Sequence, residues 1–435
     1  MQKMSAYQKT LERLYELQKF GIKLGLSSTQ NLLRGLGDPQ RGLACLHIAG
    51  TNGKGSVGAM LEAALMAAGI KAGFYTSPHL ERFSERFRVN GREITQRQVM
   101  DLASRVWAVV ELREPPTFFE FVTAMAFAHF RDQGVELAIM ETGLGGRLDA
   151  TNICEPLATV ITNLGLEHQE YLGRHLRDIA YEKAGIIKPG VPLVHGVTQP
   201  AARRLVEQTA ARLGAPVYRR GRELRFRRGP GGRFDLRGRL WVLPDLETNL
   251  VGRHQPLNAC LALGAAEALA QAGLALGPGH LRAGLTHVRW PGRLEQWPSG
   301  PGQPTLWLDG AHNPPAARAL LASLPRIQGQ RRPLVMVVGV MADKEIGRIL
   351  SLLLPAADRV IYSRPAYQRA ADPAALAAAA PPGAPPGEIE PDLGRALARA
   401  RRLAGRRGMV LVTGSLFTVG EARALLSGRH KTDLP

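Results

Sequence analysis

The sequence predicts an α/β protein whose sheets are mostly parallel and doubly wound, with helices on both faces. Short apolar runs, typical of strands buried on both sides, alternate many times with segments whose apolar residues recur at helical spacing. This alternation favours parallel strands joined by helices. The predicted strands in the earlier part of the chain are ACLHIAG, KAGFYTS, VELAIMET, LATVITN and VPLVHG. Those in the later part are TLWLDGA, RPLVMVVGV, DRVIYSR and GMVLVTGS.

The alternation is interrupted between residues 217 and 247. This part has the pattern of a small antiparallel sheet with strands RELRFRR, RFDLRGR and LWVLPDL. A long helix, QPLNACLALGAAEALAQAG, follows it. We interpret the next segment, THVRWPGRLEQWPSGPGQP, as a linker or hinge because it is rich in Pro and Gly. We therefore expect a first domain over residues 1–292 and a smaller C-terminal α/β domain over 293–435, where ADPAALAAAAPPGAPPGEIEP forms an exposed connection.

The composition excludes several classes of protein. The 435 residues are enough for two or three domains. No apolar run approaches the roughly 20 residues that span a bilayer, and the N-terminus lacks the apolar core of a signal peptide. The three cysteines, Cys45, Cys154 and Cys260, have no metal-binding or redox spacing. We therefore expect a cytoplasmic protein that does not contact a membrane.

The net charge of +19 is the unusual feature of the composition. It is compatible with nucleic acid, an anionic membrane or polyanionic small substrates. The densest basic run, residues 218–233, has little aromatic interleaving and no nucleic-acid-binding motif beside it. We therefore favour a solvated loop or hairpin there, and we expect no nucleic-acid partner.

The stretch HIAGTNGKGS, residues 47–56, predicts a phosphate-binding loop with an unusual spelling. It joins a predicted strand to a predicted helix, whose first N–H groups and dipole attract phosphate. Lys54 supplies positive charge, Ser56 can bind magnesium, and the backbone can approach a ligand closely at Gly50, Gly53 and Gly55. The alternative is a glycine-rich turn that holds no ligand.

A second cluster, ETGLGGRLDATN, directly follows another predicted strand. Glu141 stands at the carboxyl end of that strand, where open α/β sheets bind ligands, and a carboxylate there suits magnesium. The following glycines make a flexible loop that carries Arg147 and Asp149. The alternative is that Glu141 merely ends the strand and that the glycines form a turn.

A third region contains His168 and Lys183. A lone histidine such as His168 is more often structural than functional. The spacing alone places Lys183 on the surface of a helix, although its apolar flanks suggest burial, which lowers the pKa of an amine. A neutral amine can react with carbon dioxide to give a carbamate, which is an anionic metal ligand.

Together these motifs resemble a known family. GTNGKGS, YTSPHL, FFEF, ETGLGGRLDATN, EHQEYLG, YEKAGI, PGRLEQ and DGAHNP occur in the order found in the folylpolyglutamate synthase/dihydrofolate synthase family. That family belongs to the Mur ligase superfamily of ATP-dependent ligases that form amide bonds. The resemblance runs from about residue 40 to the C-terminal TGS.

The resemblance implies a set of site residues. The implied ATP contacts are Asn52, Gly53, Lys54, Gly55, Ser56, Asn258, Arg293 and Asp309. The implied ligands of two magnesium ions are Ser56, Ser77, Glu141, His168 and Lys183, with Lys183 carbamylated. The implied pterin pocket includes Phe119, Glu120, Phe121, Val122, Leu148, Asp149 and Ala150. The implied catalytic residues are Lys54, Lys183, His168 and Arg293, whereas His312 shapes its own loop.

The resemblance also implies the reaction. The enzyme would transfer the γ-phosphate of ATP to a carboxylate, and the amine of L-glutamate would then attack the acyl phosphate. Its two domains would close over ATP. The RLDATN spelling resembles bacterial enzymes that act on dihydropteroate and also extend reduced folates, and a tail-extending enzyme is the alternative. We expect a monomer.

Three other interpretations remain open from the sequence. A Mur ligase for a nucleotide sugar would need a further N-terminal domain, for which about 40 residues before the loop are too few. A P-loop ATPase acting on nucleic acid would account for the net charge. A catalytically silent ATP-binding protein would not need the predicted metal ligands.

Overall fold

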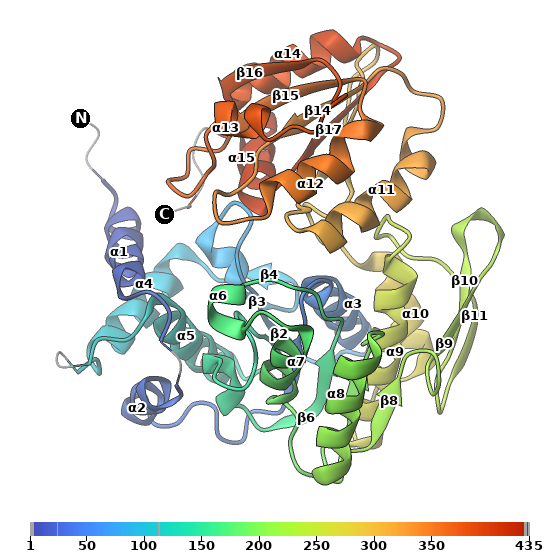
Figure 1. The fold of residues 1–435 in the computed structure, drawn as a ribbon. Coiled ribbons are helices and arrows are strands. Elements are labelled where there is room, and N and C mark those ends of the chain that lie inside the picture. The colour runs from blue at the N-terminus through green and yellow to red at the C-terminus, as the bar shows by residue number, and fades with distance from the viewer. Residues whose placement is uncertain (1–3, 24, 112–113, 430–432, 434–435) are drawn as a thin grey trace. The chain divides into compact units, whose positions relative to one another are not determined.

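The computed structural model describes residues 4–23, 25–111, 114–429 and 433 (Figure 1). The chain divides into two compact units. The first unit comprises the chain up to His79, Ser84–Asn249 and Pro256–Arg289. The second unit comprises Leu80–Phe83, Leu250–Gln255 and the chain from Trp290 onward.

The first unit is built on a mixed sheet with the strand order β4-β3-β2-β5-β1-β6-β7-β8. The six strands β2, β5, β1, β6, β7 and β8 run parallel to one another. Strands β3 and β4 add an antiparallel edge beside β2. Every residue of β1 and β5 is buried, as their apolar sequences predict. The bounds are β1 Cys45–Ala49, β2 Ala72–Tyr75, β3 Phe87–Val89, β4 Arg92–Glu93, β5 Leu137–Glu141, β6 Pro156–Ile161, β7 Leu193–His195 and β8 Val217–Arg219.

Helices cover both faces of this sheet (Figure 1). The α-helices are α1 Ala6–Tyr15, α2 Ser27–Gly35, α3 Lys54–Ala67, α4 Gln96–Trp107, α5 Phe118–Asp132, α6 Gln169–Leu172, α7 Leu176–Ala184, α8 Pro200–Arg212, α9 Gln255–Gln271 and α10 Pro278–His287. The 3-10 helices are η1 Glu16–Phe20, η2 Phe83–Arg86 and η3 Ala150–Ile153. Helix α10 crosses α3 so closely that a Cβ on Gly284 would lie 2.6 Å from the Ala64 nitrogen.

The predicted small antiparallel sheet is also present. Its strands are β9 Arg225–Arg228, β10 Phe234–Arg237 and β11 Val242–Leu246, with the 3-10 turn η4 Pro230–Gly232 between the first two. Its buried side chains are Phe234, Leu236, Leu243 and Leu246. The buried carboxylate of Glu267, on α9, accepts the backbone N–H groups of residues 239–241 at 2.9, 2.9 and 2.7 Å and so anchors the turn before β11.

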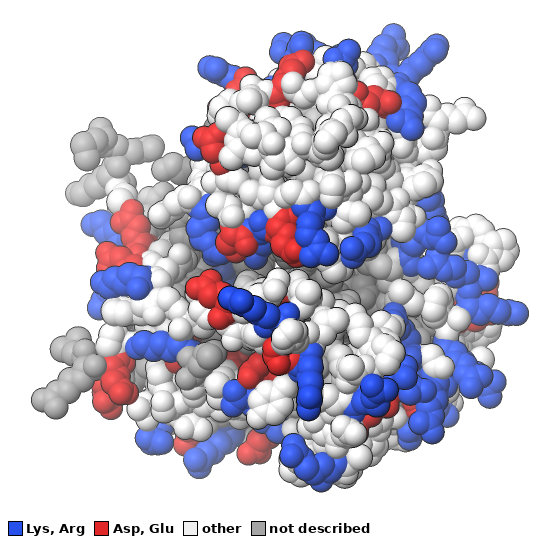
Figure 2. All heavy atoms as spheres, in the orientation of Figure 1, with Lys and Arg blue, Asp and Glu red and all other residues white. Residues whose placement is uncertain are grey.

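The basic run 218–233 begins in β8 of the large sheet and continues through a turn, β9 of the small sheet and the turn before β10. Lys and Arg side chains are spread over much of the visible face, including the region of the small sheet (Figure 2). Arg227 pairs with Asp235 and Arg233 with Asp245, each at 2.7 Å, so part of the positive charge is balanced by carboxylates of neighbouring strands. The expectation that this surface holds no nucleic acid stays a prediction.

The second unit contains a six-stranded sheet in the order β12-β13-β17-β14-β15-β16, parallel except for β12. The strands are β12 Glu295–Trp297, β13 Thr305–Asp309, β14 Leu334–Val338, β15 Arg359–Arg364, β16 Gly387–Asp392 and β17 Met409–Thr413. The helices are α11 Pro314–Gln328, α12 Ile346–Leu353, η5 Leu354–Ala356, α13 Pro373–Ala378, α14 Leu393–Ala404 and α15 Leu416–Leu426. Together the two units confirm the predicted α/β class.

Two predicted connections are wrong in part. The segment interpreted as a linker, residues 286–304, contains β12, which pairs antiparallel with β13. The Ala/Pro-rich segment 371–391 contains α13 and most of β16, which pairs with β15. Both strands lie at the edges of the sheet, where Pro and Gly are tolerated and where pairing with a neighbour outweighs local composition.

Candidate active site

The predicted phosphate loop joins β1 to α3, as the sequence indicates. Helix α3 begins at Lys54, and Gly53 precedes it in the left-handed region with φ 88°. A Cβ on Gly50 would lie 1.9 Å from Oγ1 of Thr162, and one on Gly53 would lie 2.7 Å from Oδ1 of Asn258. Only glycine fits at these two positions, and Asn258 of α9 lies beside the loop.

The end of β6 holds the backbone of the loop. The N–H of Thr51 donates to the carbonyl of Asn163, and the N–H of Asn52 donates to the Asn163 side chain, both at 3.0 Å. The hydroxyl of Thr162 donates to the Asn52 carbonyl at 2.7 Å. The loop therefore lies where the carboxyl ends of β1 and β6 meet, with the N-terminus of α3 beside it, an arrangement that suits a phosphate.

Lys54 and Glu141 face each other at the carboxyl ends of β1 and β5. The Lys54 amine donates to the Gly50 carbonyl at 2.9 Å and lies 3.9 Å from Oε1 of Glu141. The other oxygen of Glu141 accepts a hydrogen bond from the hydroxyl of Thr76. Ser56 is buried in the first turn of α3. Sequence reasoning missed Thr76, although it directly precedes the predicted Ser77.

Lys183 is buried on α7, with 2% of its side chain exposed, so the surface position that the spacing suggested is wrong. Burial lowers the pKa of its amine to about 8, against the opposing effect of Glu167. The carboxylate of Glu167 lies 3.7 Å from the amine. The sequence did not single out Glu167, and the signal that could have found it is its place directly before His168.

Helix α7 packs tightly on the glycine-rich loop that follows β5. The N–H of Arg147 donates to the Glu182 carbonyl at 2.7 Å, and the Arg147 guanidinium donates to the Glu182 carboxylate at 2.9 Å. A Cβ on Gly146 would lie 2.9 Å from the Glu182 carbonyl oxygen, and one on Gly185 would lie 2.2 Å from the Arg147 Cβ. These glycines therefore allow the helix that carries Lys183 to lie against the loop.

Asp149 organises the same loop. One carboxylate oxygen accepts the N–H groups of Gly143 at 2.9 Å and Leu144 at 2.8 Å. The other accepts the N–H of Thr151 at 3.0 Å and its hydroxyl. The Asp149 carboxylate therefore ties the segment directly after Glu141 to the start of η3.

The residues implied for the pterin pocket divide into two groups. Phe119 is half-buried on α5, and a Cβ on Gly143 would lie 2.5 Å from its ring, so Phe119 lies against the loop after β5. Leu148 is half-buried in that loop. In contrast, Glu120 accepts the N–H of its own N-cap Thr117 at 2.7 Å. The remaining members are buried, namely Phe121, Val122, Asp149 and Ala150.

The other two predicted metal ligands, Ser77 and His168, directly follow Thr76 and Glu167 in the chain. Ser77 is half-buried and follows Thr76, the residue after β2, and His168 is exposed, with φ 49°, at the start of α6. Among the described residues, no three or more His, Cys, Asp or Glu side chains form a group that could hold a metal by themselves. The Ser56 hydroxyl and the Glu141 carboxylate are hard oxygen donors, which fits magnesium bound together with phosphate oxygens.

Arg293 and Asp309 lie in the second unit. Burial raises the pKa of the Asp309 carboxyl, against the opposing charge of Arg293. The Asp309 carboxylate accepts the N–H groups of Leu294 at 2.9 Å and Ala311 at 3.0 Å. The ring of His312 lies 2.8 Å from the carbonyl oxygen of Gly310, two residues earlier, and its loop-shaping role stays a prediction.

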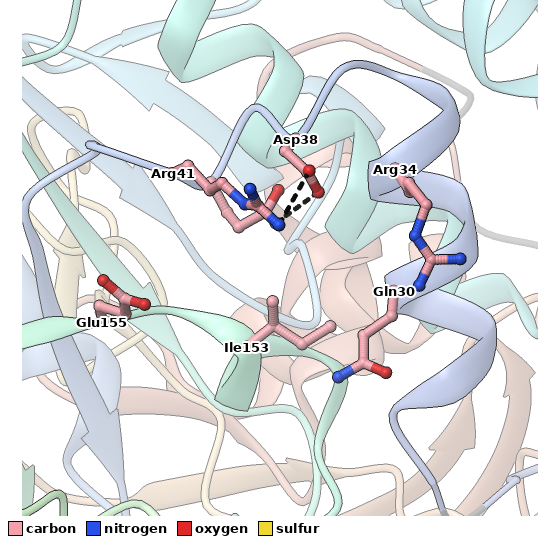
Figure 3. Close-up of a pocket in the computed structure, with 7 residues that line it drawn as sticks. Gln30, Arg34, Asp38, Arg41, Ile153 and Glu155 are labelled. Atoms are coloured by element: carbon pink, nitrogen blue, oxygen red, sulfur yellow. Dashed lines mark hydrogen bonds and ion pairs between the residues drawn. The ribbon is translucent and has the colours of Figure 1, made fainter.

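A pocket of about 330 Å³ lies beside the segments that directly precede β1 and β6, at the amino ends of these strands (Figure 3). Its lining residues are Gln30, Arg34, Asp38, Gln40, Arg41, Ile153 and Glu155. Arg41 and Asp38 form an ion pair of 3.2 Å at its rim. The pocket contains none of the predicted site residues.

Similarity to known proteins identifies the family. Residues 48–266 match the Mur ligase middle domain, and residues 292–416 match the Mur ligase glutamate ligase domain. The chain is 34% identical over 433 residues to the dihydrofolate synthase/folylpolyglutamate synthase of Bacillus subtilis, an alignment that covers 97% of this chain and 99% of the relative. The chain belongs to the folylpolyglutamate synthase/dihydrofolate synthase family.

Solved structures of family members agree with this assignment. The E. coli enzyme FolC in complex with DHPP and ADP is 30% identical, with a TM-score of 0.88 and coverage of 98% of each chain. The bifunctional folylpolyglutamate synthase/dihydrofolate synthase of Yersinia pestis, complexed with AMPPNP and Mn, is 32% identical, with a TM-score of 0.86 and the same coverage. The resemblance predicted from the motifs, the fold and the class of ATP-dependent ligase are confirmed.

No helix within the described ranges is both long and apolar enough to cross a membrane.

Proposed function

We propose that this protein uses ATP to join L-glutamate to dihydropteroate and also to reduced folates. The observation that carries the proposal is the cluster of half-buried Lys54 with the buried Glu141 and Lys183, beside a glycine loop that admits no other residue type at two positions. The names of the relatives, several of which combine both activities, support the choice of substrates.

The phosphates of ATP are assigned to the loop between β1 and α3. The N–H groups at the start of α3 and the amine of Lys54 would hold the transferring phosphoryl group, with Ser56 beside them. Asn258, which touches Gly53, is assigned to the same nucleotide. Asn52, Gly55, Arg293 and Asp309 complete the proposed ATP contacts.

Magnesium is assigned to the oxygen donors around Glu141. Ser56, Ser77, Glu141, His168 and a carbamate on Lys183 would hold two ions between them. When bound, magnesium neutralises the charge of the phosphates and orients the reacting oxygens. Thr76 would orient Glu141 by its hydrogen bond, which leaves the outer lone pairs of the carboxylate for the metal.

The environment of Lys183 supports a carbamate. Carbon dioxide reacts only with a neutral amine, and a pKa of about 8 leaves a substantial neutral fraction near physiological pH. The ammonium group would first lose one proton. The neutral amine nitrogen would then form a bond to the carbon of carbon dioxide, whose C=O π bond breaks, and would release a second proton, so a buried cation becomes a buried anion. Lys54 lies close enough to affect the pKa of Lys183 and would stabilise that anion.

The pterin is assigned to the space between α5 and the loop after β5. Phe119 would stack on the ring, and Leu148 would pack beside it, because both are partly exposed next to the glycine loop. Glu120, Phe121, Val122, Asp149 and Ala150 would shape the wall of the pocket from behind.

In the proposed reaction, the carboxylate of the pterin substrate attacks the γ-phosphorus of ATP, and ADP leaves. The amine of L-glutamate then attacks the acyl phosphate, an amide bond forms, and inorganic phosphate and a proton leave. Lys54 would stabilise the charge that develops on the phosphoryl oxygens. We also propose that the chain acts as a cytoplasmic monomer with these small molecules as its partners.

The test is to measure ADP release with ATP and L-glutamate, with dihydropteroate or a reduced folate as the acceptor. Release with both acceptors supports the bifunctional enzyme. Release with the reduced folate alone indicates tail extension only. No release with either acceptor, together with ATP hydrolysis that DNA or RNA stimulates and salt suppresses, would overturn the proposal in favour of the nucleic-acid ATPase.

A further inference from the structure

His47 lies in the middle of β1, is fully buried and is not among the proposed ATP, metal or pterin contacts. Its strand leads directly into the phosphate loop. A buried imidazole costs free energy unless its polar atoms are paired. The ring is paired on one side, because Nε2 lies 2.8 Å from Oγ1 of Thr151.

The direction of this hydrogen bond follows from the bonds that Thr151 already makes. The hydroxyl of Thr151 donates its single proton to Oδ1 of Asp149. Its oxygen can therefore only accept from His47, so Nε2 of His47 carries a proton. The result is a one-way chain in which His47 donates to Thr151 and Thr151 donates to Asp149.

The chain ends on the group that organises the loop after β5. The second oxygen of Asp149 accepts the N–H groups of Gly143 and Leu144. These two residues lie just after Glu141, the proposed metal ligand, and Gly143 contacts the ring of Phe119. A change at His47 would therefore reach both the metal end and the pterin end of the proposed site.

We propose that His47 is a positioning residue for the ligase reaction, which acts through Thr151 to hold the Asp149 carboxylate and, with it, residues 142–152 in their working shape. The inference rests on the proposed function. His47 itself lies outside the proposed substrate contacts. Removal of a group that orients the residues around a reacting centre typically lowers affinity or activity by roughly 10- to 100-fold.

His195 provides a matched control. It is also a fully buried histidine of the same sheet, on β7, but the carboxylate nearest to it is that of Glu207 on α8, 3.6 Å away. His195→Leu therefore removes an equally buried imidazole without touching the chain from His47 to Asp149. A purely structural role of buried histidines would give the two variants similar effects.

The first measurement is amide hydrogen exchange at Gly143 and Leu144 in the full-length protein. His47→Leu and Thr151→Val should speed exchange there by roughly 10- to 100-fold, because Asp149 loses its orientation. His47→Gln, whose amide can still donate to Thr151, should restore slow exchange. The nearly isosteric Thr151→Val tests the same chain if His47→Leu does not fold.

The second measurement is steady-state kinetics with each substrate varied in turn. His47→Leu and Thr151→Val should each lower kcat/KM for the pterin substrate by roughly 10- to 100-fold, with little change in the KM for ATP. The double variant should be no worse than either single variant, since both break one chain. His195→Leu should leave these ratios unchanged.

The two measurements separate the two proposals. If the wild-type protein releases no ADP with any pterin, the proposed function fails, whereas the exchange rates still test the chain from His47. Unchanged exchange in His47→Leu and Thr151→Val overturns the inference. The inference is also overturned if exchange is faster in these variants while the kinetics of an active enzyme stay unaltered. The same holds if His195→Leu changes exchange and kinetics as much as His47→Leu does.

Discussion

Replacing Lys54 by methionine tests the assignment of the phosphate loop. The Lys54 amine lies 3.9 Å from the Glu141 carboxylate, and the two side chains are 15% and 6% exposed. At an effective dielectric constant of about 20, two unit charges at this distance attract each other by about 4 kcal/mol. Part of this is offset because a methionine need not be desolvated, so we expect a loss of about 2 kcal/mol in the free energy of unfolding.

Such a loss leaves the protein folded, since domains of this kind are stable by roughly 5–15 kcal/mol. The effect on catalysis should be larger. Removing a positive charge aimed at a developing anion typically lowers kcat by roughly 10²- to 10³-fold. The assay is ADP release with dihydropteroate and L-glutamate, combined with urea unfolding of the same variant.

The control is Lys71→Met, because Lys71 directly precedes β2 and takes no part in the cluster. We expect wild-type kcat for that variant. A folded Lys54→Met protein with kcat close to that of the wild type would refute the assignment of the loop. A variant that loses far more than the expected stability would show that Lys54 holds the fold rather than the substrate.

Three further predictions follow from buried groups. Lys183→Ala should abolish activity, and short carboxylic acids should partly restore it by replacing the carbamate, as ADP release would show; a wild-type rate in the variant would remove Lys183 from the metal site. For His195, burial lowers the pKa to about 4 from an ordinary 6.5. As the pH falls, this imidazole takes up a proton in the unfolded chain before it does so in the folded protein. The free energy of unfolding should therefore fall by about 3 kcal/mol between pH 6.5 and pH 4. Urea unfolding should show a smaller loss over this range in His195→Gln, and an unchanged profile would contradict the shift. Glu267→Gln should destabilise the first unit by roughly 2–4 kcal/mol, since one of the three N–H groups it accepts would face an amide donor; a melting temperature equal to that of the wild type would contradict this estimate.

Local patterns were enough for the regular elements and for the phosphate loop. The apolar runs predicted β1, β5 and β6 because strands covered on both faces need apolar residues at every position. The order of glycine, lysine and serine after β1 predicted the start of α3 and the place of Lys54. The same patterns failed at β12 and β16, whose pairing partners lie elsewhere in the chain.

The candidate site could be predicted only residue by residue. Glu141 was found because it ends a strand, whereas the only sequence signal of Thr76 and Glu167 is that each directly precedes a predicted site residue, Ser77 or His168. Each acquires its role from a neighbour distant in sequence: Thr76 bonds Glu141, and Glu167 faces Lys183. Their importance depends on distances that no local pattern encodes.

The sequence by itself determined the class of fold, the family and the chemical identity of the groups that could bind phosphate and metal. Only the tertiary structure decided that Lys183 is buried and that His47 is linked to Asp149 through Thr151. The physical reason is that residue type and spacing specify local geometry, whereas burial and hydrogen-bond partners arise when separate strands and helices pack together. A lysine on a short helix is usually exposed. Lys183 is buried because α7 packs against the glycine-rich loop after β5, where the glycines let helix and loop approach closely enough to exclude water.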